Sequence, residues 1–577
     1  MMGMKEKGKI ADFPLLFHTH HASREQFRDD SYGRKAVILV IKEARWYAWC
    51  EILRILCGSV ERRRHVAIER LYLMRFLLRT SWHILCFFFL LSSIIACIPS
   101  GSSSSTSSYA PTTGAAQIAV NADKALATIP ESAFGINTAV WDNNLLDPAV
   151  PDVLRKAGVT MLRYPGGSTA DVYHWKDHTT TQRKDYVNPN TNFDAFMRVV
   201  QQVGAQAFIT VNYGTNKEGT GGGDPAEAAD WVRYANQTKK YGIKYWEIGN
   251  EVYGNGSYDA RWEADLHVRK GPAAYANNVL TFAQMMKAAD PTVKVGVSVT
   301  IPDLSGNQQT MANWNPTVLS LTCSQVDFVD MHWYPAWHSQ DTGGPDEQLL
   351  SRPAEASTML QRLRREIAQQ CPAQAKKIEI FLGEVNTNIA PKQQVSLVNA
   401  LFLADVYMDW LGSGGANVSW WDLHEGMQIG GNNRSAYGST EYGTLGMLAN
   451  GDCKSGLCQP PPDTPFPPYY GLQMLTHLGK PGDQIVAATS DRRLVTVHAV
   501  RQANGNLALL LINKDPRTTM RAKIVLSGYR PGMTATVYAY DKNSSAISSN
   551  SVQLAGAAFM QTLPPYSLTT LVLSPDE

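Results

Sequence analysis

Eight short apolar runs alternate with longer stretches of helical periodicity between residues 134 and 470, and this alternation constrains the fold more than any other feature. A strand–helix repeat of this kind is typical of a parallel sheet wrapped by helices. Eight units predict a TIM (β/α)8 barrel over residues 134–482, with its functional groups at the C-terminal ends of the strands. The predicted strands are 134–139, 161–164, 206–212, 245–248, 293–299, 328–332, 378–382 and 417–421.

Helix signals lie between these runs. Amphipathic or apolar stretches at 193–203 and 395–411 predict two of the barrel helices. Asp224 followed by Pro225 is typical of an N-cap and a first helical residue, and Tyr469 lies where the last barrel helix is expected to begin.

The pattern changes to strict alternation near residue 483. Turn residues separate the runs at 494–499, 507–512, 523–526, 535–539 and 568–573, and no helical stretch lies between them. Residues 483–577 are therefore predicted to form an antiparallel β-sandwich. Residues 117–133, which precede the first barrel strand, also include a strand-like run, and we expect it to join that sandwich from the other end of the chain.

The N-terminal region has the features of an export signal. In residues 74–97, two arginines precede a short apolar run that ends in Ala96-Cys97, which is typical of a signal peptide, and the cysteine resembles a bacterial lipobox. The competing interpretation, a membrane anchor helix, requires a longer run of about 20 apolar residues. Residues 1–73 are then a mis-assigned extension, and residues 98–116 a Ser-rich linker. We expect an exported protein, periplasmic or on the cell surface, attached to a bacterial membrane only through a lipid on Cys97.

Composition excludes some functions. The chain has 53 Lys and Arg against 51 Asp and Glu, so its net charge of +2 argues against a nucleic-acid partner. Four cysteines follow the linker, and an even number in an exported protein favours disulfides over zinc. Cys453 and Cys458 bracket a short loop, which would leave Cys323 to pair with Cys371. The sequence contains no cluster with metal-ligand spacing, and we expect neither a metal nor another cofactor.

Two carboxylates each follow an apolar strand directly. Glu251 ends the segment Tyr245-Trp246-Glu247-Ile248-Gly249-Asn250-Glu251, and Glu384 follows the strand at 378–382. Both side chains are expected at the barrel mouth, because catalytic groups lie at the C-terminal ends of barrel strands. Strands four and seven lie on opposite sides of a barrel, so the two groups would face each other across the mouth. Retaining glycosidases use two carboxyl groups about 5–5.5 Å apart, one as the nucleophile and one as the acid/base. A single glutamate after a strand is more often a loop residue or N-cap, but two at these positions favour catalysis.

Short motifs add a resemblance. The pair Asn250-Glu251 is similar to the strand-four end of the clan A glycoside hydrolases, and the Glu384 segment resembles their strand-seven nucleophile. The run 162–167, followed by 173–177, looks like the strand-two signature of the family 51 α-L-arabinofuranosidases, with relatives in families 39 and 79. Ser168 departs from that signature, which has Asn after the two glycines. The resemblance implies Glu384 as nucleophile, Glu251 as acid/base, Asn250 as a ligand of the sugar 2-hydroxyl and Trp421 as a sugar platform.

The remaining candidates flank this pair. Arg163 would keep Glu384 ionised, whereas Glu251 should hold its proton because the charge on Glu384 raises its pKa. His332 and Tyr334 close strand six, where each could contact a catalytic carboxyl, although a histidine there is often a satisfied core residue. Further candidate sugar ligands are Asn212, Trp175, Asp422, His424 and Glu425, and the tryptophans could equally belong to the core.

These features predict a retaining glycoside hydrolase that releases non-reducing α-L-arabinofuranosyl residues from plant-type polysaccharides or oligosaccharides. The alternatives are a β-xylosidase or β-glucuronidase of the same clan, or an inactive carbohydrate-binding lipoprotein. A decayed enzyme would have lost one of the two glutamates, so the pair argues against the last alternative. The sequence does not indicate the oligomeric state.

Overall fold

The computed structural model describes residues 115–182, 185–258, 261–301, 311, 313–335, 346–387, 393–429 and 441–576. Residues 111–577 form one compact unit. The predicted extension, signal peptide and lipidation site, and all but the last two residues of the predicted linker, lie outside the described residues. No helix in the described part of the chain is both long and apolar enough to cross a membrane.

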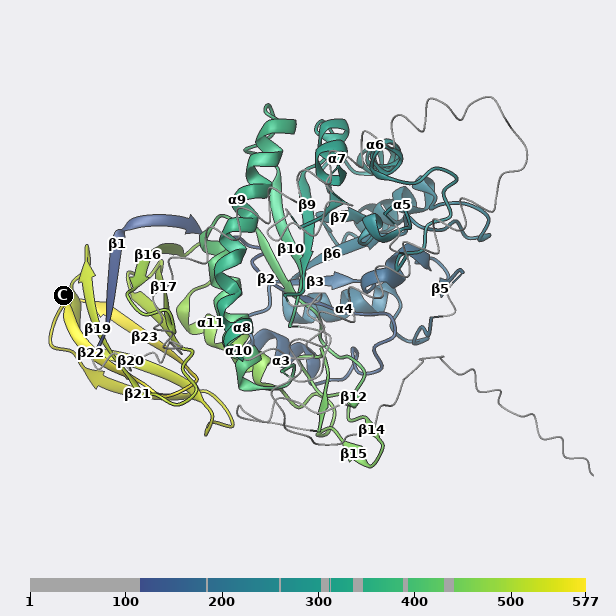
Figure 1. The fold of residues 1–577 in the computed structure, drawn as a ribbon. Coiled ribbons are helices and arrows are strands. Elements are labelled where there is room, and N and C mark those ends of the chain that lie inside the picture. The colour runs from purple at the N-terminus through teal and green to yellow at the C-terminus, as the bar shows by residue number, and fades with distance from the viewer. Residues whose placement is uncertain are drawn as a thin grey trace, which may run out of the picture. The chain divides into compact units, whose positions relative to one another are not determined.

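Eight parallel strands close into a barrel (Figure 1). Each strand pairs in parallel with both neighbours, and β11 pairs with β2 to complete the ring. The predicted TIM barrel is therefore confirmed, with strand bounds that differ from the predicted ones by a few residues. The strands are β2 (Phe134–Asn137), β3 (Met161–Tyr164), β6 (Gln206–Val211), β7 (Tyr245–Ile248), β8 (Lys294–Val299), β9 (Phe328–Trp333), β10 (Glu379–Val385) and β11 (Asn417–Trp420).

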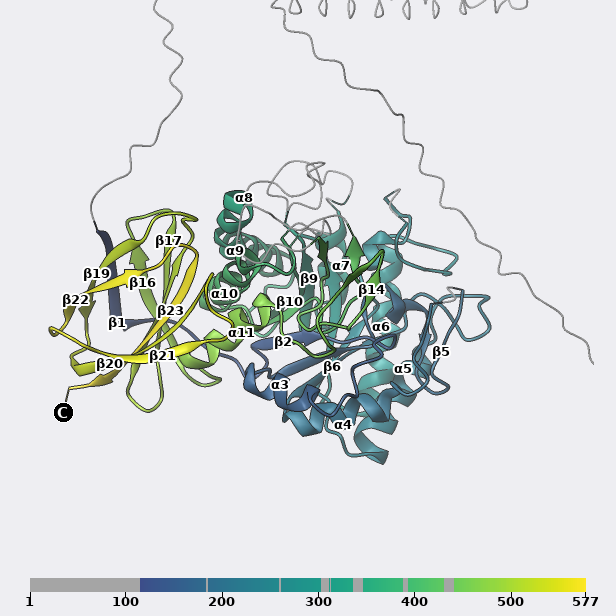
Figure 2. The ribbon, with the colours of Figure 1, turned by 90° about the horizontal axis from the view of Figure 1, so that it is seen from below.

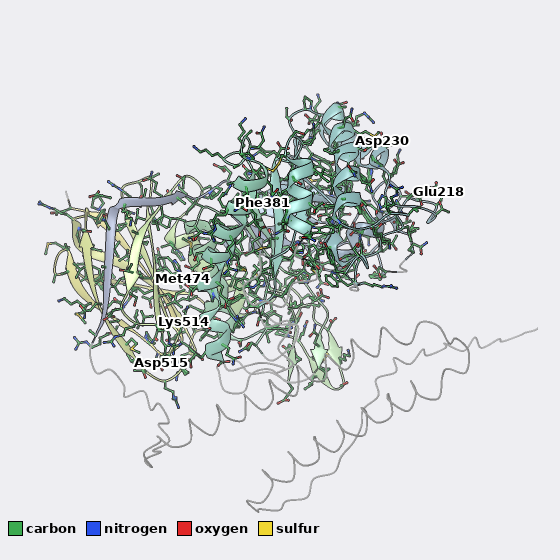
Figure 3. The ribbon with its side chains drawn as sticks, turned by 45° about the horizontal axis from the view of Figure 1, so that its top comes forward. Glu218, Asp230, Phe381, Met474, Lys514 and Asp515 are labelled. Carbon is green, nitrogen blue, oxygen red and sulfur yellow. A yellow bond between two sulfur atoms is a disulfide. The ribbon has the colours of Figure 1, made fainter. Side chains whose placement is uncertain are left out.

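An aromatic cluster fills the barrel near the start of its strands. Phe328 and Phe381 lie with ring centroids 4.7 Å apart, and Phe208 and Tyr245 pack around them. Figure 3 labels Phe381 within the barrel. A side chain on Gly296 would overlap the Phe328 ring, with its Cβ 2.2 Å from that ring. Apolar side chains thus close one end of the barrel, and its buried polar side chains gather at the other end.

Helices cover the outside of the barrel (Figures 1 and 2). The predicted N-cap is present, because the Asp224 side chain accepts a hydrogen bond from the Ala226 amide at 2.8 Å. Asn192 caps the helix predicted at 193–203 in the same way. The helices are α3 (Val150–Lys156), α4 (Phe193–Val203), α5 (Pro225–Val232), α6 (Pro272–Ala289), α7 (Trp314–Thr322), α8 (Asp346–Ser351), α9 (Pro353–Gln370), α10 (Leu397–Gly412) and α11 (Pro467–Leu478).

The loops carry short helical turns and three two-stranded hairpins. The turns are η2 (Gly167–Val172), η3 (Arg233–Thr238) and η4 (Val252–Gly254). The hairpins pair β4 (Tyr173–His174) with β5 (Thr179–Thr180), β12 (Gln428–Ile429) with β13 (Tyr442–Gly443), and β14 (Cys453–Lys454) with β15 (Leu457–Cys458).

The C-terminal strands form one continuous nine-stranded sheet around an apolar cluster of their own, so the predicted C-terminal β-domain, called the sandwich below, is confirmed. One pairing differs from the antiparallel prediction, since β1 is antiparallel to β16 but parallel to β19. The reason is that β1 comes from the other end of the chain, so no hairpin fixes its direction. The strands are β1 (Ala116–Thr128), β16 (Gln484–Ser490), β17 (Val495–Arg501), β18 (Leu507–Asn513), β19 (Met520–Ser527), β20 (Pro531–Asp541), β21 (Ser548–Gln553), β22 (Ala558–Leu563) and β23 (Ser567–Pro575).

The barrel and the sandwich share a buried junction. Helix α11 packs against β18, β20 and β23, and α10 is buried on nearly all sides. Within this junction Asp405 of α10 contacts His498 of β17, with 2.7 Å between Oδ1 and Nε2, and also pairs with Lys514. Burial alone would raise the pKa of Asp405, but Lys514 and His498 hold it well below its ordinary value. Figure 3 labels Lys514 on this side of the sandwich.

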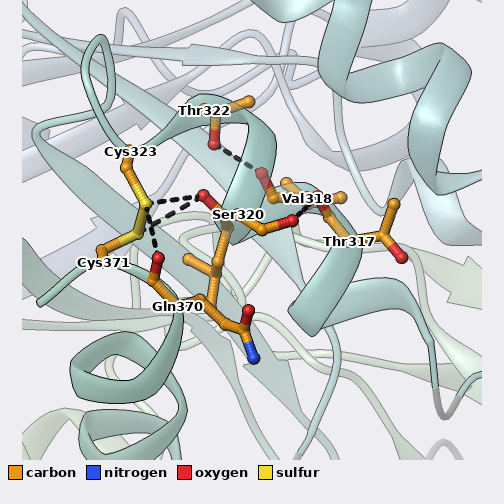
Figure 4. Close-up of a disulfide and its surroundings, with 8 residues drawn as sticks. Thr317, Val318, Ser320, Thr322, Cys323, Gln370 and Cys371 are labelled. Atoms are coloured by element: carbon orange, nitrogen blue, oxygen red, sulfur yellow. Dashed lines mark hydrogen bonds between the residues drawn. A yellow bond between two sulfur atoms is a disulfide. The ribbon is translucent and has the colours of Figure 1, made fainter.

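Two disulfides join the four cysteines. Cys323 pairs with Cys371, which ties the end of α7 to the end of α9 (Figure 4), and Cys453 pairs with Cys458 across the β14–β15 hairpin. These are the pairings that the sequence favoured.

The two disulfides should differ in their effect on stability. They close loops with sequence separations of 48 and 5 residues. Because a crosslink removes more chain entropy when its loop is longer, replacing Cys323 and Cys371 by Ala should lower the free energy of unfolding by about 4 kcal/mol, against about 2 kcal/mol for Cys453 and Cys458. Urea denaturation of the two double variants measures the difference, and equal losses would contradict the entropic account.

Candidate active site

Glu251 lies at the barrel mouth on an unusual backbone. After β7, Gly249 has a φ of 73° and Glu251 itself a φ of 40°, in the left-handed region that side chains other than glycine rarely occupy. A Cβ on Gly249 would lie 2.5 Å from the Val252 side chain, so this turn requires glycine. Strain of this kind is retained mainly where a side chain must point in one direction.

A β-bulge positions Glu384. The pairing of β10 with β9 is in register up to Leu382 and shifts before Glu384, which leaves Gly383 as the extra residue. The Gly383 amide donates to Asp330 Oδ1 at 2.7 Å, and a Cβ on Gly383 would lie 2.0 Å from the other oxygen of that carboxylate. The bulge turns Glu384 toward His332 and Arg163. The prediction put Glu384 after the strand, whereas β10 runs to Val385.

Arg163, at the end of β3, is buried between carboxylates with 1% of its surface exposed. Its Nη1 donates to Glu384 Oε1 at 2.7 Å, and its Nη2 donates to Glu247 Oε2 at 2.9 Å. The same nitrogens reach the side-chain oxygens of Asn137 and Asn250 at 3.0 and 2.8 Å. Burial alone would lower the pKa of Arg163, but Glu247, Glu384 and Asp330 raise it by more than burial lowers it. The pKa therefore lies above its ordinary value, and the guanidinium stays charged.

His332 links the two candidate carboxylates. Its Nδ1 is 2.8 Å from Glu251 Oε1 and 3.5 Å from Glu384 Oε2, and its Nε2 is 3.3 Å from Asp330 Oδ2. Carboxylate oxygens of Glu251 and Glu384 and a ring nitrogen of His332 all lie within 4.8 Å of one another. The two glutamates from strands four and seven therefore meet at the mouth.

The charges in this cluster differ from the sequence expectation. Burial would lower the pKa of His332, but Glu384, Asp330 and Glu251 raise it well above its ordinary value, so it is an imidazolium. Burial would raise the pKa of Glu251, yet hydrogen bonds from His332 and Trp262 lower it. We expected Glu384 to raise that pKa. The expectation was wrong because it omitted these two hydrogen-bond donors.

Tyr334 completes the set around Glu384. Its hydroxyl donates to Glu384 Oε2 at 2.7 Å, opposite the bond from Arg163 to Oε1. Burial, followed by the charge of Glu384, raises the pKa of Tyr334 well above its ordinary value, so the hydroxyl keeps its proton and remains a donor. Both oxygens of Glu384 are therefore held by donors, which fixes the orientation of its carboxylate.

The structure does not bring two predicted sugar ligands to this cluster. Trp175 is 8% exposed, stacks on Trp231 with ring centroids 5.7 Å apart, and donates its indole N–H to the Glu227 carbonyl, so it is a core residue. The Asn212 amide donates to the Tyr173 carbonyl, and its oxygen accepts from the Thr215 amide at 3.0 Å. The bonds of Asn212 fix the loop after β6. Neither Trp175 nor Asn212 is therefore placed as a sugar ligand.

Strand eight supplies an aromatic wall. Trp421 follows β11, is half-buried, and lies with its ring 6.3 Å from that of Trp141. Gly167 approaches it closely, since a Cβ there would be 2.7 Å from the Trp421 ring. The next residue, Asp422, is 1% exposed, and neither carboxylate oxygen has a hydrogen-bond partner within the described ranges. Burial, then Glu425, Asp142 and Glu384, raise the pKa of Asp422 well above its ordinary value.

His424 is a structural residue, although we had considered it as a sugar ligand. Its Nδ1 is 2.8 Å from Asp142 Oδ2 and its Nε2 is 3.1 Å from Asp463 Oδ1, so both ring nitrogens are occupied. Burial opposes the charged form, but the two aspartates raise the pKa of His424 to about 9.

The stability contributed by His424 should depend on pH. Because its folded pKa exceeds the unfolded value of 6.5, the contribution is complete below the unfolded pKa and is lost as pH rises through about 9. We expect His424→Gln to lower the free energy of unfolding by about 3 kcal/mol more near pH 6 than near pH 10. Urea denaturation of both proteins across this range measures the change, and a pH-independent difference would contradict the charge assignment.

Sequence reasoning missed several residues of the site. Glu247 and Asp330 precede candidate residues in their own strands, and period-two alternation could have identified Asp330, which lies two positions before His332 on the same face. Glu263 was not predicted, and its Oε1 accepts hydrogen bonds from Ser168 at 2.7 Å and Asn250 at 2.9 Å. Trp262, whose indole N–H donates to Glu251 Oε2 at 2.6 Å, was also missed. No local signal marks these two loop residues.

Groups of acidic and histidine side chains do converge in the described part of the chain. Two of them share His332, combining it with Glu247 and Asp330 or with Glu251 and Glu384, and the third joins Asp405, Asp409 and His498. The guanidinium of Arg163 contacts the first two groups, and the ammonium of Lys514 contacts the third. Cations of the protein itself therefore balance the negative charge at each group. That the chain needs no cofactor stays a prediction.

Comparison with known proteins agrees with this geometry. The sequence model of the family described as cellulase (glycosyl hydrolase family 5) matches residues 121–426, which is more than half of the chain. A probable α-L-arabinofuranosidase C of Aspergillus fumigatus is 27% identical over 225 residues, 33% of this chain and 40% of that protein. An intracellular exo-α-(1→5)-L-arabinofuranosidase of Bifidobacterium longum is 28% identical over 258 residues, 39% of this chain and 44% of that protein. The chain thus spans less than half the length of these relatives.

The fold also has solved counterparts. The thermostable family 51 α-L-arabinofuranosidase of Thermotoga petrophila superposes with a TM-score of 0.61 at 19% identity, covering 79% of this chain and 99% of that structure. At this identity the likeness concerns the fold alone. The barrel, the meeting of two glutamates at its mouth and the matching family model lead to one conclusion: the chain belongs to the family described as cellulase (glycosyl hydrolase family 5) and is a clan A glycoside hydrolase.

Proposed function

We propose that this chain is a retaining α-L-arabinofuranosidase, similar to family 51, that releases non-reducing α-L-arabinofuranosyl residues from plant-type polysaccharides or oligosaccharides. The observation that carries the proposal is the approach of the Glu251 and Glu384 carboxylates, because one oxygen of each lies within 4.8 Å of one oxygen of the other. Retaining glycosidases hold their two carboxyl groups about 5–5.5 Å apart, whereas inverting enzymes separate them by about 6.5–9.5 Å to leave room for a water. An approach this close favours the retaining arrangement.

In this proposal Glu384 is the nucleophile. Arg163 and Tyr334 each donate to one of its oxygens at 2.7 Å, which fixes the orientation of the carboxylate. Glu384 attacks the anomeric carbon as the bond from that carbon to the leaving oxygen breaks. The product of this step is a glycosyl ester of Glu384, and the leaving oxygen takes up a proton.

Glu251 delivers that proton. Its Oε1 lies 2.8 Å from the imidazolium nitrogen of His332, so the two groups hold one proton between them. When the leaving oxygen gains negative charge at Glu251, the proton passes from the pair to that oxygen. In the second step Glu251 accepts a proton from water, the water oxygen bonds to the anomeric carbon, and Glu384 departs as carboxylate. Trp421 is the proposed platform for the sugar ring.

The choice of arabinofuranose rests on the relatives, two of which are named α-L-arabinofuranosidases. Substrates of the β-glucuronidase type are less well supported, because a glucuronate carboxylate needs a cation. Within the described part of the site, Arg163 already pairs with Glu247 and Glu384. A binding protein that has lost catalysis would not require both glutamates with their donors. β-Xylosides remain the alternative substrate.

A panel of 4-nitrophenyl glycosides tests the proposal. Residues 98–577 should cleave the α-L-arabinofuranoside faster than the β-D-xyloside or the β-D-glucuronide. Glu218→Ala should retain the activity of the wild type and is the control for substitutions of the catalytic glutamates. Glu218 is an exposed carboxylate that Figure 3 labels at the edge of the molecule. Preference for another glycoside would change the substrate assignment, and no cleavage of any glycoside would refute the exo-glycosidase assignment.

We further propose that the protein is exported and lipid-anchored through Cys97, with residues 74–97 as the signal peptide and residues 98–116 as the linker. The support is the sequence pattern alone. Expression of residues 74–577 in a bacterial host, followed by separation of membranes, should recover the wild type in the membrane fraction and Cys97→Ser in the soluble fraction. Equal distribution of the two proteins would refute the anchor.

A further inference from the structure

Trp262 combines two properties that are uncommon for a tryptophan. Its indole N–H donates to Glu251 Oε2 at 2.6 Å, so it touches the proposed acid/base directly. It is also 43% exposed, and within the described residues it is the only tryptophan classed as exposed. A large apolar side chain that remains in contact with water beside a catalytic group is a feature that core packing does not explain.

The loop after β7 holds this indole in place. The ring lies edge-on to Tyr253, with centroids 6.0 Å apart, and rests on Gly254, where a Cβ would be 2.4 Å from the ring. The next residue, Glu263, accepts hydrogen bonds from Asn250 and Ser168. One side of the indole is therefore packed on the loop, while the other side faces solvent in a fixed orientation before any ligand arrives.

We propose that Trp262 forms the subsite for the leaving-group sugar, the neutral ring attached to the far side of the bond that is cleaved. This inference rests on the proposed function. The acid/base must contact the glycosidic oxygen, so the ring that carries this oxygen as the leaving group lies next to Glu251. Trp262 is bonded to the same carboxylate and offers its exposed aromatic surface there. Aromatic rings bind the C–H faces of sugars, and a preset orientation lowers the entropic cost of binding.

Two variants separate the roles of the ring and of its N–H. Trp262→Phe keeps an aromatic ring and removes the donor to Glu251, whereas Trp262→Ala removes both. Two substrates complete the design: an α-1,5-linked arabinofuranosyl oligosaccharide, whose leaving group is a sugar, and methyl α-L-arabinofuranoside, whose leaving group has no ring. Both substrates require a proton from Glu251, so loss of the N–H should affect both in the same direction.

The expected result is a difference between the variants on one substrate only. On the methyl glycoside, Trp262→Phe and Trp262→Ala should have equal kcat/KM. On the oligosaccharide, kcat/KM of Trp262→Ala should be about tenfold lower than that of Trp262→Phe, mostly through a higher KM. The reason is that only the alanine variant lacks the stacking surface. If the ratio of kcat/KM between Trp262→Phe and Trp262→Ala were the same on both substrates, the subsite would be refuted. Trp262 would then only support the loop.

A pH profile gives a second readout. The titratable groups that face Glu251 are His332, Glu384, Arg163, Glu263, Tyr253 and Tyr334, and neither variant changes them. Because the indole N–H stabilises the ionised form of Glu251, its removal should raise the pKa of that carboxyl. The alkaline limb of kcat/KM should therefore move to higher pH in both variants. An unmoved limb would contradict the contact with Glu251, and a wild type inactive on both substrates would overturn the subsite together with the proposed function.

Discussion

Glu384→Ala should reduce kcat/KM for the preferred glycoside by at least about 10⁴-fold, because it removes the carboxylate that is proposed to form the covalent intermediate. The fold should survive, since Glu384 is a small part of the network and Arg163 keeps its contacts with Glu247 and Asn250. Activity is measured with the 4-nitrophenyl glycoside, and folding with thermal unfolding. Glu218→Ala, prepared in parallel, should behave as the wild type.

Azide distinguishes the two glutamates. In Glu384→Ala the space between Arg163 and Tyr334 is vacant, so azide can attack the anomeric carbon from the side of the lost nucleophile and give a glycosyl azide of inverted configuration. In Glu251→Ala the ester of Glu384 still forms, and azide then displaces it from the opposite face with net retention. Nuclear magnetic resonance identifies the two products. The same configuration from both variants would refute the assignment of roles.

Much of this architecture could be predicted from the sequence, because its causes are local. Each barrel strand is a short apolar run next to a helical stretch, and Glu251 follows its strand directly, so its place at the mouth follows from the barrel geometry. The strand β21 (Ser548–Gln553) was missed because its exposed, serine-rich sequence has no apolar alternation.

The charge state of Glu251 required the structure. Its pKa depends on donors from two other places in the chain, His332 at the end of β9 and Trp262 eleven residues further along the loop. Electrostatic repulsion from Glu384 was a correct argument about a pair, but the outcome depends on every group within hydrogen-bond distance. Trp175 was misassigned for a related reason, since sequence position does not reveal that Trp231 lies 5.7 Å away.

Arg163→Met should destabilise the fold as well as abolish catalysis. Arg163 and Glu247 are 1% and 0% exposed, and removal of the guanidinium would leave the buried Glu247 without the cation that contacts it. Breaking a buried ion pair from one side costs about 3–5 kcal/mol in the free energy of unfolding. Arg163→Lys keeps the charge but loses the planar fork that reaches Glu247 and Glu384 together. It should be more stable than Arg163→Met and still lose about 100-fold in kcat/KM.

A second substitution tests whether unpaired charge is the cause. Glu247 keeps a pKa of about 7 despite Arg163, because burial and Asp330 oppose its ionisation. Without Arg163 the charge of the buried Glu247 carboxyl loses the cation in contact with it. Glu247→Gln in the Arg163→Met background removes that charge and should recover part of the lost stability. Activity should not return, since Oε1 of Glu384 would still lack the donor that Arg163 supplies. If the double variant were less stable than Arg163→Met, the lost stability would come from the packing of the long Arg163 side chain. The positive charge of Arg163 would then contribute less to the stability of the barrel than its packing does.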